Sequence, residues 1–418
     1  MKKIFCLSLL LGLLFCQPAK AQEITKTGYN FGPLPVVAFD ADKGFQYGAL
    51  LNIYNFGDGS YYPNYKEKWY IEASFYTKGT QFFTLSYDSK YLIPGVRSSF
   101  ALTRMVDKAL DFYGFNGYES FYDPSLGTAF YRMDRSVNMA KADFSGNIWD
   151  NKLFWEAGYF FSSTKAGVRA ESETSLFENY TKWGLLPEND IDGGITSMLR
   201  LGLMYDTRDR EGAPSRGIWA EAHTLLAPKF LGGTQAESYY RYAITFRHYL
   251  PLYNDQVVFA YRLNYQGTMG NYAPYYDLPF LSVFGEGFNR DAVGGYRTVR
   301  GMLRNRVQGL DVAFFNAELR YRFVEFALWN QNIAFGVSAF CDGGITVRPY
   351  EMTPNEAYRA EYEAYRALGT ANDQLHLTAG AGLRFIMNQN FIVAFEYGKP
   401  FNKQDGNGSF YINTGFLF

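Results

Sequence analysis

The sequence predicts an all-β protein, a transmembrane antiparallel β-barrel. The prediction depends on the composition, on alternation of apolar and polar residues in segments of about ten residues, and on a secretory signal at the amino terminus. Of the 418 residues, 19% are aromatic and 41 are glycines, which favours strands and turns over helices. After residue 21 no stretch reaches the ~20 apolar residues that a spanning helix needs. Strands are therefore expected to cross the bilayer.

Residues 1–21 are predicted to be a signal peptide. Two lysines precede an apolar run at residues 4–15, and Ala19 and Ala21 provide the small residues of a cleavage site. The mature chain is therefore expected to leave the cytoplasm for the bacterial outer membrane, with lipid around it. It retains only Cys341 of the three cysteines, so no internal disulfide is expected.

The charged residues argue against nucleic acid as a partner. The chain has 40 Lys and Arg against 41 Asp and Glu, for a net charge of -1. A nucleic-acid-binding domain usually carries a basic excess that neutralises phosphates. No such excess is present.

Alternation is clearest between Gln256 and Met269. One face of this segment is apolar and aromatic, and it consists of Val257, Phe259, Tyr261, Leu263 and Tyr265. The opposite face consists of Ala260, Arg262, Asn264 and Gln266. The segment around Glu318 repeats the pattern. A strand with lipid on one side and water on the other has these two faces.

The strands are expected to form one domain, residues 45–418, after a short periplasmic segment at 22–44 that has no room for a folded domain. Backbone polar groups in a bilayer must be paired, so such strands have to close into a barrel. The length indicates about 14 to 18 strands. Between residues 90 and 131 the pattern is blurred, partly by Pro94 and Gly95.

The end of the chain favours a barrel over a soluble β-sandwich or an adhesin, which share the alternation. Phe410, Phe416 and Phe418 align on one face of the last segment, and the final residue is aromatic. Aromatic residues at strand ends are typical of the girdles of membrane barrels. Gly415, Phe416 and Phe418 are therefore interpreted as a carboxy-terminal strand signal.

One short helix is predicted in an external loop. Thr353, Pro354 and Glu356 fit the N-cap, N1 and N3 positions of a capping box, and Gly369 fits the end. The helix would place three tyrosines on one face: Tyr358, Tyr362 and Tyr365. It would brace the loop or contact a partner protein.

Enzymatic chemistry finds little support in the sequence. His223, His248 and His376 lie on separate segments without the spacing of metal ligands. There is no nucleophile elbow and no phosphate-binding loop. We expect no catalytic residue, no metal site and no cofactor.

Two separated motifs suggest a contact inside the barrel. A long connection between strands carries Arg300 and Gly301, and a later strand places Phe340, Asp342 and Gly344 on its polar face. A guanidinium on a loop folded into the barrel would meet a carboxylate and an aromatic ring on the wall. The glycine would leave space for the loop, so the contact would fix the loop in the lumen.

A third motif consists of Asp206, Arg208 and Asp209, followed by Pro214 and Gly217.

In their order and spacing these motifs resemble the BamA/TamA/FhaC superfamily of outer-membrane assembly and secretion barrels, the bacterial surface antigen family. The resemblance covers roughly residues 196–418. It implies 16 strands and a hairpin at the motif that runs from Asp206 to Gly217. It also implies that Arg300, in the sixth external loop, reaches into the lumen toward Asp342. Two features depart from the family: Met302 replaces the usual aromatic residue after Arg-Gly, and the sequence has no room for POTRA domains.

The resemblance implies a role in inserting or translocating outer-membrane or secreted proteins, or in an accessory subunit of that machinery. Assembly machinery and client proteins are then the expected partners. In typical members a client strand is thought to add at the seam of the barrel, here between Phe45–Tyr54 and Phe410–Phe418.

Two alternatives remain open from the sequence. One is an adhesive or structural surface barrel. The other is a small-solute pore or transporter. It is suggested by charged residues expected in the lumen, namely Arg241, Arg247, Arg262, Arg320, Arg322, Arg384, Glu318 and Glu396.

Overall fold

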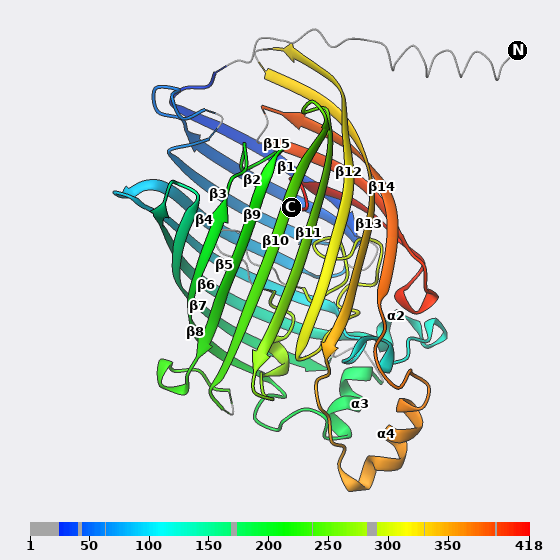
Figure 1. The fold of residues 1–418 in the computed structure, drawn as a ribbon. Coiled ribbons are helices and arrows are strands. Elements are labelled where there is room, and N and C mark those ends of the chain that lie inside the picture. Colours follow the sequence, from blue (N-terminus) through cyan, green and yellow to red (C-terminus); the bar gives the residue numbers. More distant parts are fainter. Residues whose placement is uncertain are drawn as a thin grey trace, which may run out of the picture.

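The computed structural model is a 16-stranded antiparallel β-barrel (Figure 1). Each strand pairs with the next strand along the chain, so the order in the sheet is the order in the sequence. The predicted fold class and strand number are confirmed. The structure describes residues 25–40, 44–62, 64–168, 174–235, 237–281, 291–329, 331–388 and 391–418. The predicted signal peptide lies outside these residues.

The strands are of unequal length, from six to 18 residues. They are β1 (Tyr29–Asp40), β2 (Gly44–Asn55), β3 (Glu67–Tyr76), β4 (Gln81–Ile93), β5 (Val96–Asp111), β6 (Arg132–Trp149), β7 (Leu153–Val168), β8 (Gly193–Asp206), β9 (Gly217–Ala227), β10 (Tyr239–Tyr253), β11 (Val257–Met269), β12 (Asp311–Leu328), β13 (Gln331–Arg348), β14 (His376–Met387), β15 (Phe391–Pro400) and β16 (Ser409–Thr414).

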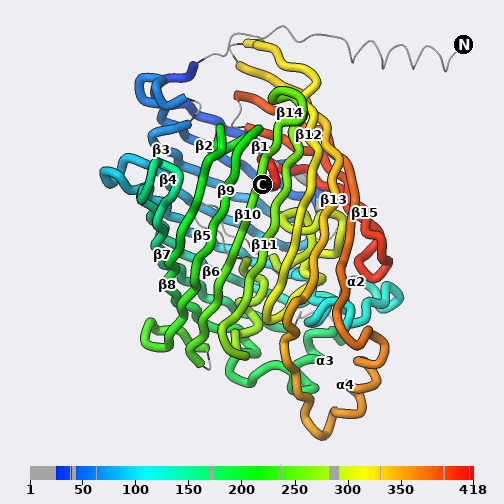
Figure 2. Tube along the Cα trace, viewed as in Figure 1, coloured from blue at the N-terminus to red at the C-terminus, as the bar shows by residue number. Residues whose placement is uncertain are grey.

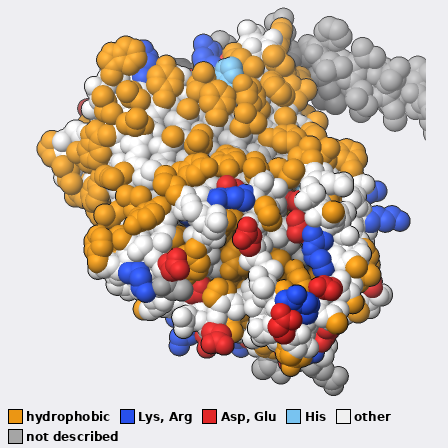
Figure 3. Space-filling model, turned by 60° about the horizontal axis from the view of Figure 1, so that its bottom comes forward, with side chains coloured by type: hydrophobic (Ala, Val, Ile, Leu, Met, Phe, Trp, Pro, Cys, Tyr) orange, Lys and Arg blue, Asp and Glu red, His pale blue; other side chains and the backbone are white. Residues whose placement is uncertain are grey.

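The alternation in the sequence becomes an inner and an outer face of the wall. On β11, Arg262 and Gln266 are buried inside the barrel, whereas Leu263 between them is half exposed on the outside. Figure 3 shows hydrophobic side chains spread over the wall and charged side chains gathered toward the loop end. This distribution fits a wall that faces lipid.

The two ends of the barrel differ. Long connections, such as residues 112–131 and 349–375, lie at one end, and short turns such as 150–152 lie at the other. In outer-membrane barrels the long loops are external and the short turns periplasmic. Among the described residues no helix is long and apolar enough to cross a membrane.

The short helices belong to the connections. They are η1 (Gly117–Glu119), η2 (Pro124–Leu126), α2 (Gly127–Phe130), α3 (Leu176–Lys182), η3 (Lys229–Leu231), η4 (Tyr275–Asp277), η5 (Glu356–Tyr358), α4 (Arg359–Arg366) and η6 (Lys403–Asp405). The sequence predicted only one of them.

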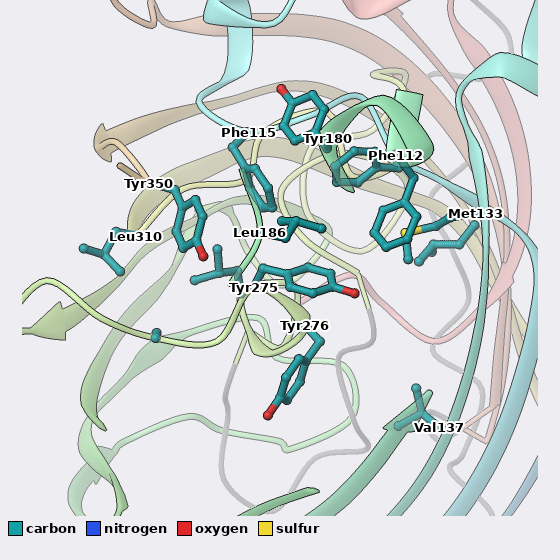
Figure 4. Close-up of a cluster of buried hydrophobic side chains, with 14 of the residues drawn as sticks. Phe112, Phe115, Met133, Val137, Tyr180, Leu186, Tyr275, Tyr276, Leu310 and Tyr350 are labelled. Carbon is teal, nitrogen blue, oxygen red and sulfur yellow. The ribbon is translucent and has the colours of Figure 1, made fainter. Parts of the chain in front are cut away.

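An aromatic cluster packs the external loops together over the barrel (Figure 4). Phe112 contacts Tyr180 of α3 with ring centroids 5.1 Å apart, and Phe115 contacts Tyr350 at 4.7 Å. Tyr275 of η4 joins the same cluster. Loops from distant parts of the chain therefore share one apolar core.

The helix predicted near residue 353 begins later than expected. The 3-10 turn η5 starts at Glu356, after Asn355, and α4 runs from Arg359 to Arg366. Neither start has a side-chain cap, so Thr353 is not an N-cap, and α4 ends before Gly369. The predicted apolar face is present, since Tyr358, Tyr362 and Tyr365 pack against the aromatic cluster.

The barrel begins earlier than the sequence indicated. β1 lies within residues 22–44, which we expected to be periplasmic, and pairs with β2 over its whole length. Pro33 and Pro35 obscured this strand, because proline is found in strands mainly at sheet edges. β1 is such an edge, since among the described strands it pairs only with β2. Pro94 and Gly95, which also blurred the pattern, form the short turn from β4 to β5.

The last strand is shorter than expected. β16 ends at Thr414, whereas the aromatic pattern predicted a strand that continues to Phe418. Gly415 has a φ of 90°, a left-handed conformation that turns the chain out of the strand. Phe418 is buried and packs with Tyr249 and Ala260 on the inner wall. The carboxy terminus accordingly lies within the outline of the barrel (Figure 2).

Candidate functional site

The connection between β11 and β12 folds back into the barrel. We call its described residues, 270–281 and 291–310, the lumen loop. Its tip is a closed turn, because Val293 pairs with Val307 and the backbone N–H of Gly294 donates to Thr298 Oγ1 at 2.8 Å. The wall holds this turn through Asn316, whose Nδ2 donates to the carbonyl of Thr298.

Arg300 at the loop tip is fully buried and bonded to three carboxylates. Its Nε and Nη2 donate to Asp342 at 2.8 and 3.0 Å, and its backbone N–H donates to the same carboxylate at 3.1 Å. Its Nη1 donates to Glu318 and Glu396, both at 2.8 Å. A planar guanidinium suits this arrangement because it can donate in several fixed directions at once.

The three acids come from β12, β13 and β15, so one loop residue connects separate strands of the wall. Their charges exceed that of Arg300, and two further cations help to balance them. Arg320 Nε donates to Glu318 at 2.9 Å, and Arg384 Nη2 donates to Glu396 at 2.9 Å. Buried charges are tolerated only when they are paired and hydrogen-bonded, as they are in this network.

Phe340 lies beneath the guanidinium. The Cζ atom of Arg300 is 3.5 Å from the centre of the Phe340 ring, a close cation–π contact. Phe340 in turn needs Gly380 on β14, where a Cβ atom would approach the ring to 2.3 Å. The sequence did not single out Gly380, although its position opposite Phe340 follows from the register.

Glycines allow the loop to approach the wall closely. Gly301 has a φ of 91°, and a Cβ atom there would lie 2.3 Å from the backbone of Gly398. At Gly344 a Cβ atom would meet Val293 of the loop at 2.5 Å. The space predicted for Gly344 is thus filled by the loop.

Met302 packs well in place of the aromatic residue that the resemblance implied. It is 1% exposed. It belongs to an apolar cluster of Leu281, Val293, Val299, Met302, Val307, Val312 and Phe314. The substitution therefore leaves the loop tip buried in apolar contacts.

The outer part of the lumen loop is also held by arginines. Arg304 Nη2 donates to Asp107 on β5 at 2.7 Å and to Asp291 at 2.6 Å. Arg306 donates to the carbonyls of Gly117, Ser120 and Gln404. The loop thus contacts both the barrel wall and its neighbouring loops.

The motif hairpin connects β8 and β9 at residues 207–216, on the periplasmic side. Asp206 accepts two hydrogen bonds from Arg208, from Nε at 2.9 Å and from Nη2 at 2.8 Å. Gly217 has a φ of 103°, and a Cβ atom there would lie 2.3 Å from the carbonyl oxygen of Thr207. A glycine is needed where the two strands meet so closely.

The other motif residues close the same turn. Asp209 accepts the backbone N–H and the hydroxyl of Ser215, and Pro214 is buried beside it. Glu211 forms an ion pair with Arg97 at 3.1 Å. The hairpin is therefore tied to β5, three strands away along the wall.

The carboxy-terminal residues lie beside the loop network. Arg320, which bonds Glu318, also donates to the carbonyl of Phe418 at 3.0 Å. The Cζ atom of Arg320 is 4.3 Å from the ring centre of Phe416. Gly415, Phe416 and Phe418, which the sequence analysis assigned to the last strand, therefore lead into the lumen and contact the arginines of the wall.

A second buried polar cluster connects the external loops. His376, the first residue of β14, lies between Asp405 and Asp373, with nitrogen–oxygen distances of 2.6 and 3.0 Å. Asp373 also accepts the backbone N–H groups of Tyr118 and Thr346. Residues of three external loops thus meet at the rim of the barrel.

The Omp85 superfamily domain matches residues 73–418. The chain belongs to the Omp85 superfamily. The 16-stranded barrel and this membership place the protein in the bacterial outer membrane. No curated protein matches the sequence.

Two solved structures illustrate how this Omp85 chain resembles other barrels. BamA from Haemophilus ducreyi, solved without POTRA domains 1-3, is 17% identical with a TM-score of 0.54, over 93% of this chain and 70% of BamA. CdiB from Escherichia coli is 12% identical with a TM-score of 0.56, over 94% of this chain and 63% of CdiB. At these identities the likeness concerns the fold.

We predict that Arg300→Ala and Asp342→Ala each lower the free energy of unfolding by about 3–5 kcal/mol, because each leaves a buried charge without its partner. The double variant should lose clearly less than the sum, since the first substitution already breaks the contact. Urea unfolding in lipid vesicles measures the three changes.

Arg216→Ala is the matched control for these variants. Arg216 pairs with Asp255 at 2.7 Å, but its side chain is 60% exposed. Its loss should cost at most about 1 kcal/mol. Fully additive losses for Arg300→Ala and Asp342→Ala would contradict the buried pairing.

A pH dependence is expected at Asp373. Burial raises its pKa, but hydrogen bonds from His376 and from two backbone N–H groups outweigh burial and hold the pKa below its ordinary value. A lowered folded pKa stabilises the loop above the unfolded value of about 3.9, and this contribution is lost as pH falls through the folded pKa. Limited proteolysis should therefore cut residues 349–375 faster below about pH 4. In Asp373→Asn, the rate at which the loop is cut should no longer rise as the pH falls below about 4. If the variant is still cut faster at low pH, as the wild type is, the assignment is contradicted.

Proposed function

We propose that this Omp85 barrel takes part in the insertion or translocation of other proteins at the outer membrane, either directly or as a subunit of the machinery that does so. The observation that carries the proposal is the Omp85 domain match over residues 73–418. The buried contact of Arg300 with Asp342 and Phe340 supports it, since these are the motif residues through which the chain resembles assembly and secretion barrels. The expected partners are outer-membrane lipid, assembly machinery and client proteins. We infer a non-enzymatic role from the family.

The small-solute pore is not favoured by the arrangement of the lumen. The arginines that suggested a pore bind the loop, the tail and the wall. Four of them donate to backbone oxygen atoms: Arg241 to Asp277, Arg262 to Arg297, Arg320 to Phe418 and Arg322 to Asp255. Glu318 and Glu396 bond Arg300. Apart from the half-buried Arg322, these side chains are buried in contacts within the protein, so they do not line an open channel.

The seam joins β1 and β16, not the segment Phe45–Tyr54 that the sequence analysis assigned to it. The two strands are neighbours, and among the described residues no ladder connects them. β16 has only six residues, against twelve in β1. An edge of this kind is a place where an extended segment can add to a sheet.

The edge of β1 that faces the seam has few backbone N–H groups that could donate hydrogen bonds. The N–H of Phe56 donates to the carbonyl of Gly28, and the register from β1 to β2 has no shift. Even-numbered residues of β1 therefore bond β2, and odd-numbered residues, including Pro33 and Pro35, face the seam. Proline has no N–H, so this edge offers an interrupted row of hydrogen bonds. This feature favours translocation or an accessory role over the use of β1 as a template for new strands.

Affinity purification of the tagged chain from native outer membranes tests the proposed function. We expect outer-membrane assembly components or client proteins to be recovered with the wild-type barrel, and less of them with Arg300→Ala, whose loop is released. Arg216→Ala, which breaks only an exposed pair, should recover as much as the wild type. Recovery of the barrel alone, together with large steady conductance of the isolated protein in planar bilayers, would contradict the proposal and support a pore.

A further inference from the structure

We propose that Glu156, Glu221 and His223 form a binding site for a divalent transition-metal ion on the inner wall of the barrel. Each of the three offers one ligand atom, and these atoms lie within 4.8 Å of one another. The sequence analysis found no metal-ligand spacing because Glu156 is on β7, whereas Glu221 and His223 are on β9. The site lies far along the wall from Arg300 and does not depend on the proposed function.

The strand register brings these residues together. Glu156 pairs with Gly202 on β8, and Gly202 pairs with His223 on β9. Glu156 and His223 are therefore in one row across three strands, with a glycine between them. Glu221 is two residues from His223 on the same strand, so its side chain points to the same face.

Gly202 leaves the space that this arrangement needs. A Cβ atom at Gly202 would lie 2.5 Å from Cβ of His223 and 2.8 Å from the carbonyl oxygen of Ala222. A side chain here would separate the imidazole from the carboxylate across the row. Because Gly202 has no side chain, the three ligand residues can face a common space.

The three ligand residues are buried, and one carboxylate oxygen of Glu156 has no hydrogen-bond partner among the described residues. Glu156, Glu221 and His223 are 4, 2 and 4% exposed. Nδ1 of His223 lies 2.6 Å from Oε1 of Glu221. Within the described part of the chain, Oε2 of Glu156 has no hydrogen-bond partner. Two buried carboxylates at such short range repel each other unless a cation or a proton lies between them.

The neighbouring cations are shared with another carboxylate. Arg200 on β8 acts on Glu156 through its charge, but it donates to Asp143 on β6 at 3.1 Å. Lys141 lies 3.2 Å from the same Asp143 carboxylate. A metal ion would supply positive charge directly at the two glutamates.

The donor set suits Zn²⁺ or a similar ion. Imidazole nitrogen and carboxylate oxygen are ordinary zinc ligands, with bonds of about 2.0–2.2 Å. In tetrahedral geometry such bonds place ligand atoms about 3.3 Å apart. On binding, Nδ1 of His223 and Oε1 of Glu221, which are 2.6 Å apart, would therefore separate slightly, and the carboxylate of Glu156 would rotate toward them. A water molecule would complete the site. The bound ion would link β7 to β9 across β8, four residues from the periplasmic start of β9.

Calorimetric titration with Zn²⁺ tests this proposal. The purified full chain is folded in detergent, treated with EDTA and dialysed into metal-free buffer. We expect one Zn²⁺ to bind per chain. Glu156→Gln and His223→Asn should each weaken binding about tenfold or more, since each removes one ligand.

His248→Asn is the matched control, because His248 contacts Tyr261 at 3.2 Å on the outer face of β10 and should not affect binding. The absence of Zn²⁺ binding to the wild type, or equal binding by Glu156→Gln and His223→Asn, would overturn the site and leave a protonated Glu156 in its place. If these variants fail to fold, the X-ray absorption spectrum of the zinc-loaded wild type decides. One imidazole with oxygen ligands supports the site, whereas two imidazoles or a sulfur ligand overturns it.

Discussion

A single buried guanidinium holds the lumen loop to the barrel wall. Arg300 is bonded to acids on three strands and rests on the ring of Phe340. These acids would repel one another in a dry interior without a cation, and the cation could not be buried without the acids. The loop and the wall therefore require each other, and glycines such as Gly301 and Gly380 are needed so that the groups can meet.

The same constraint determines what fills the lumen. Arg320 neutralises Glu318 and at the same time binds the carbonyl of Phe418, so the carboxy-terminal residues and the lumen loop share one network. The tail leaves the wall at Gly415, which keeps β16 short and the seam with β1 without a ladder among the described strands. The position of the tail in the lumen and the weak pairing at the seam are thus linked consequences of one set of contacts.

Much of the fold could be predicted because side chains alternate between the two faces of a membrane strand, and one face is apolar while the other is polar. The motifs also indicated that Arg300 should meet Asp342, and the structure places these side chains in contact. The errors occur where local pattern and tertiary structure conflict. Proline in β1 is tolerated only because β1 is an edge, and the aromatic end of the chain resembles a strand although it enters the lumen. The grouping of Glu156 with His223 depends on register across β8, which no spacing along the sequence contains.

Hydrogen–deuterium exchange of the folded protein in lipid vesicles tests most directly whether Arg300 fixes the lumen loop. Backbone amides of residues 291–310 should exchange slowly in the wild type. In Arg300→Lys, which keeps the charge but loses the fork of donors, they should exchange much faster, while the amides of β12 and β13 stay protected. Rapid exchange of the loop in the wild type, or equal protection in both proteins, would contradict the account.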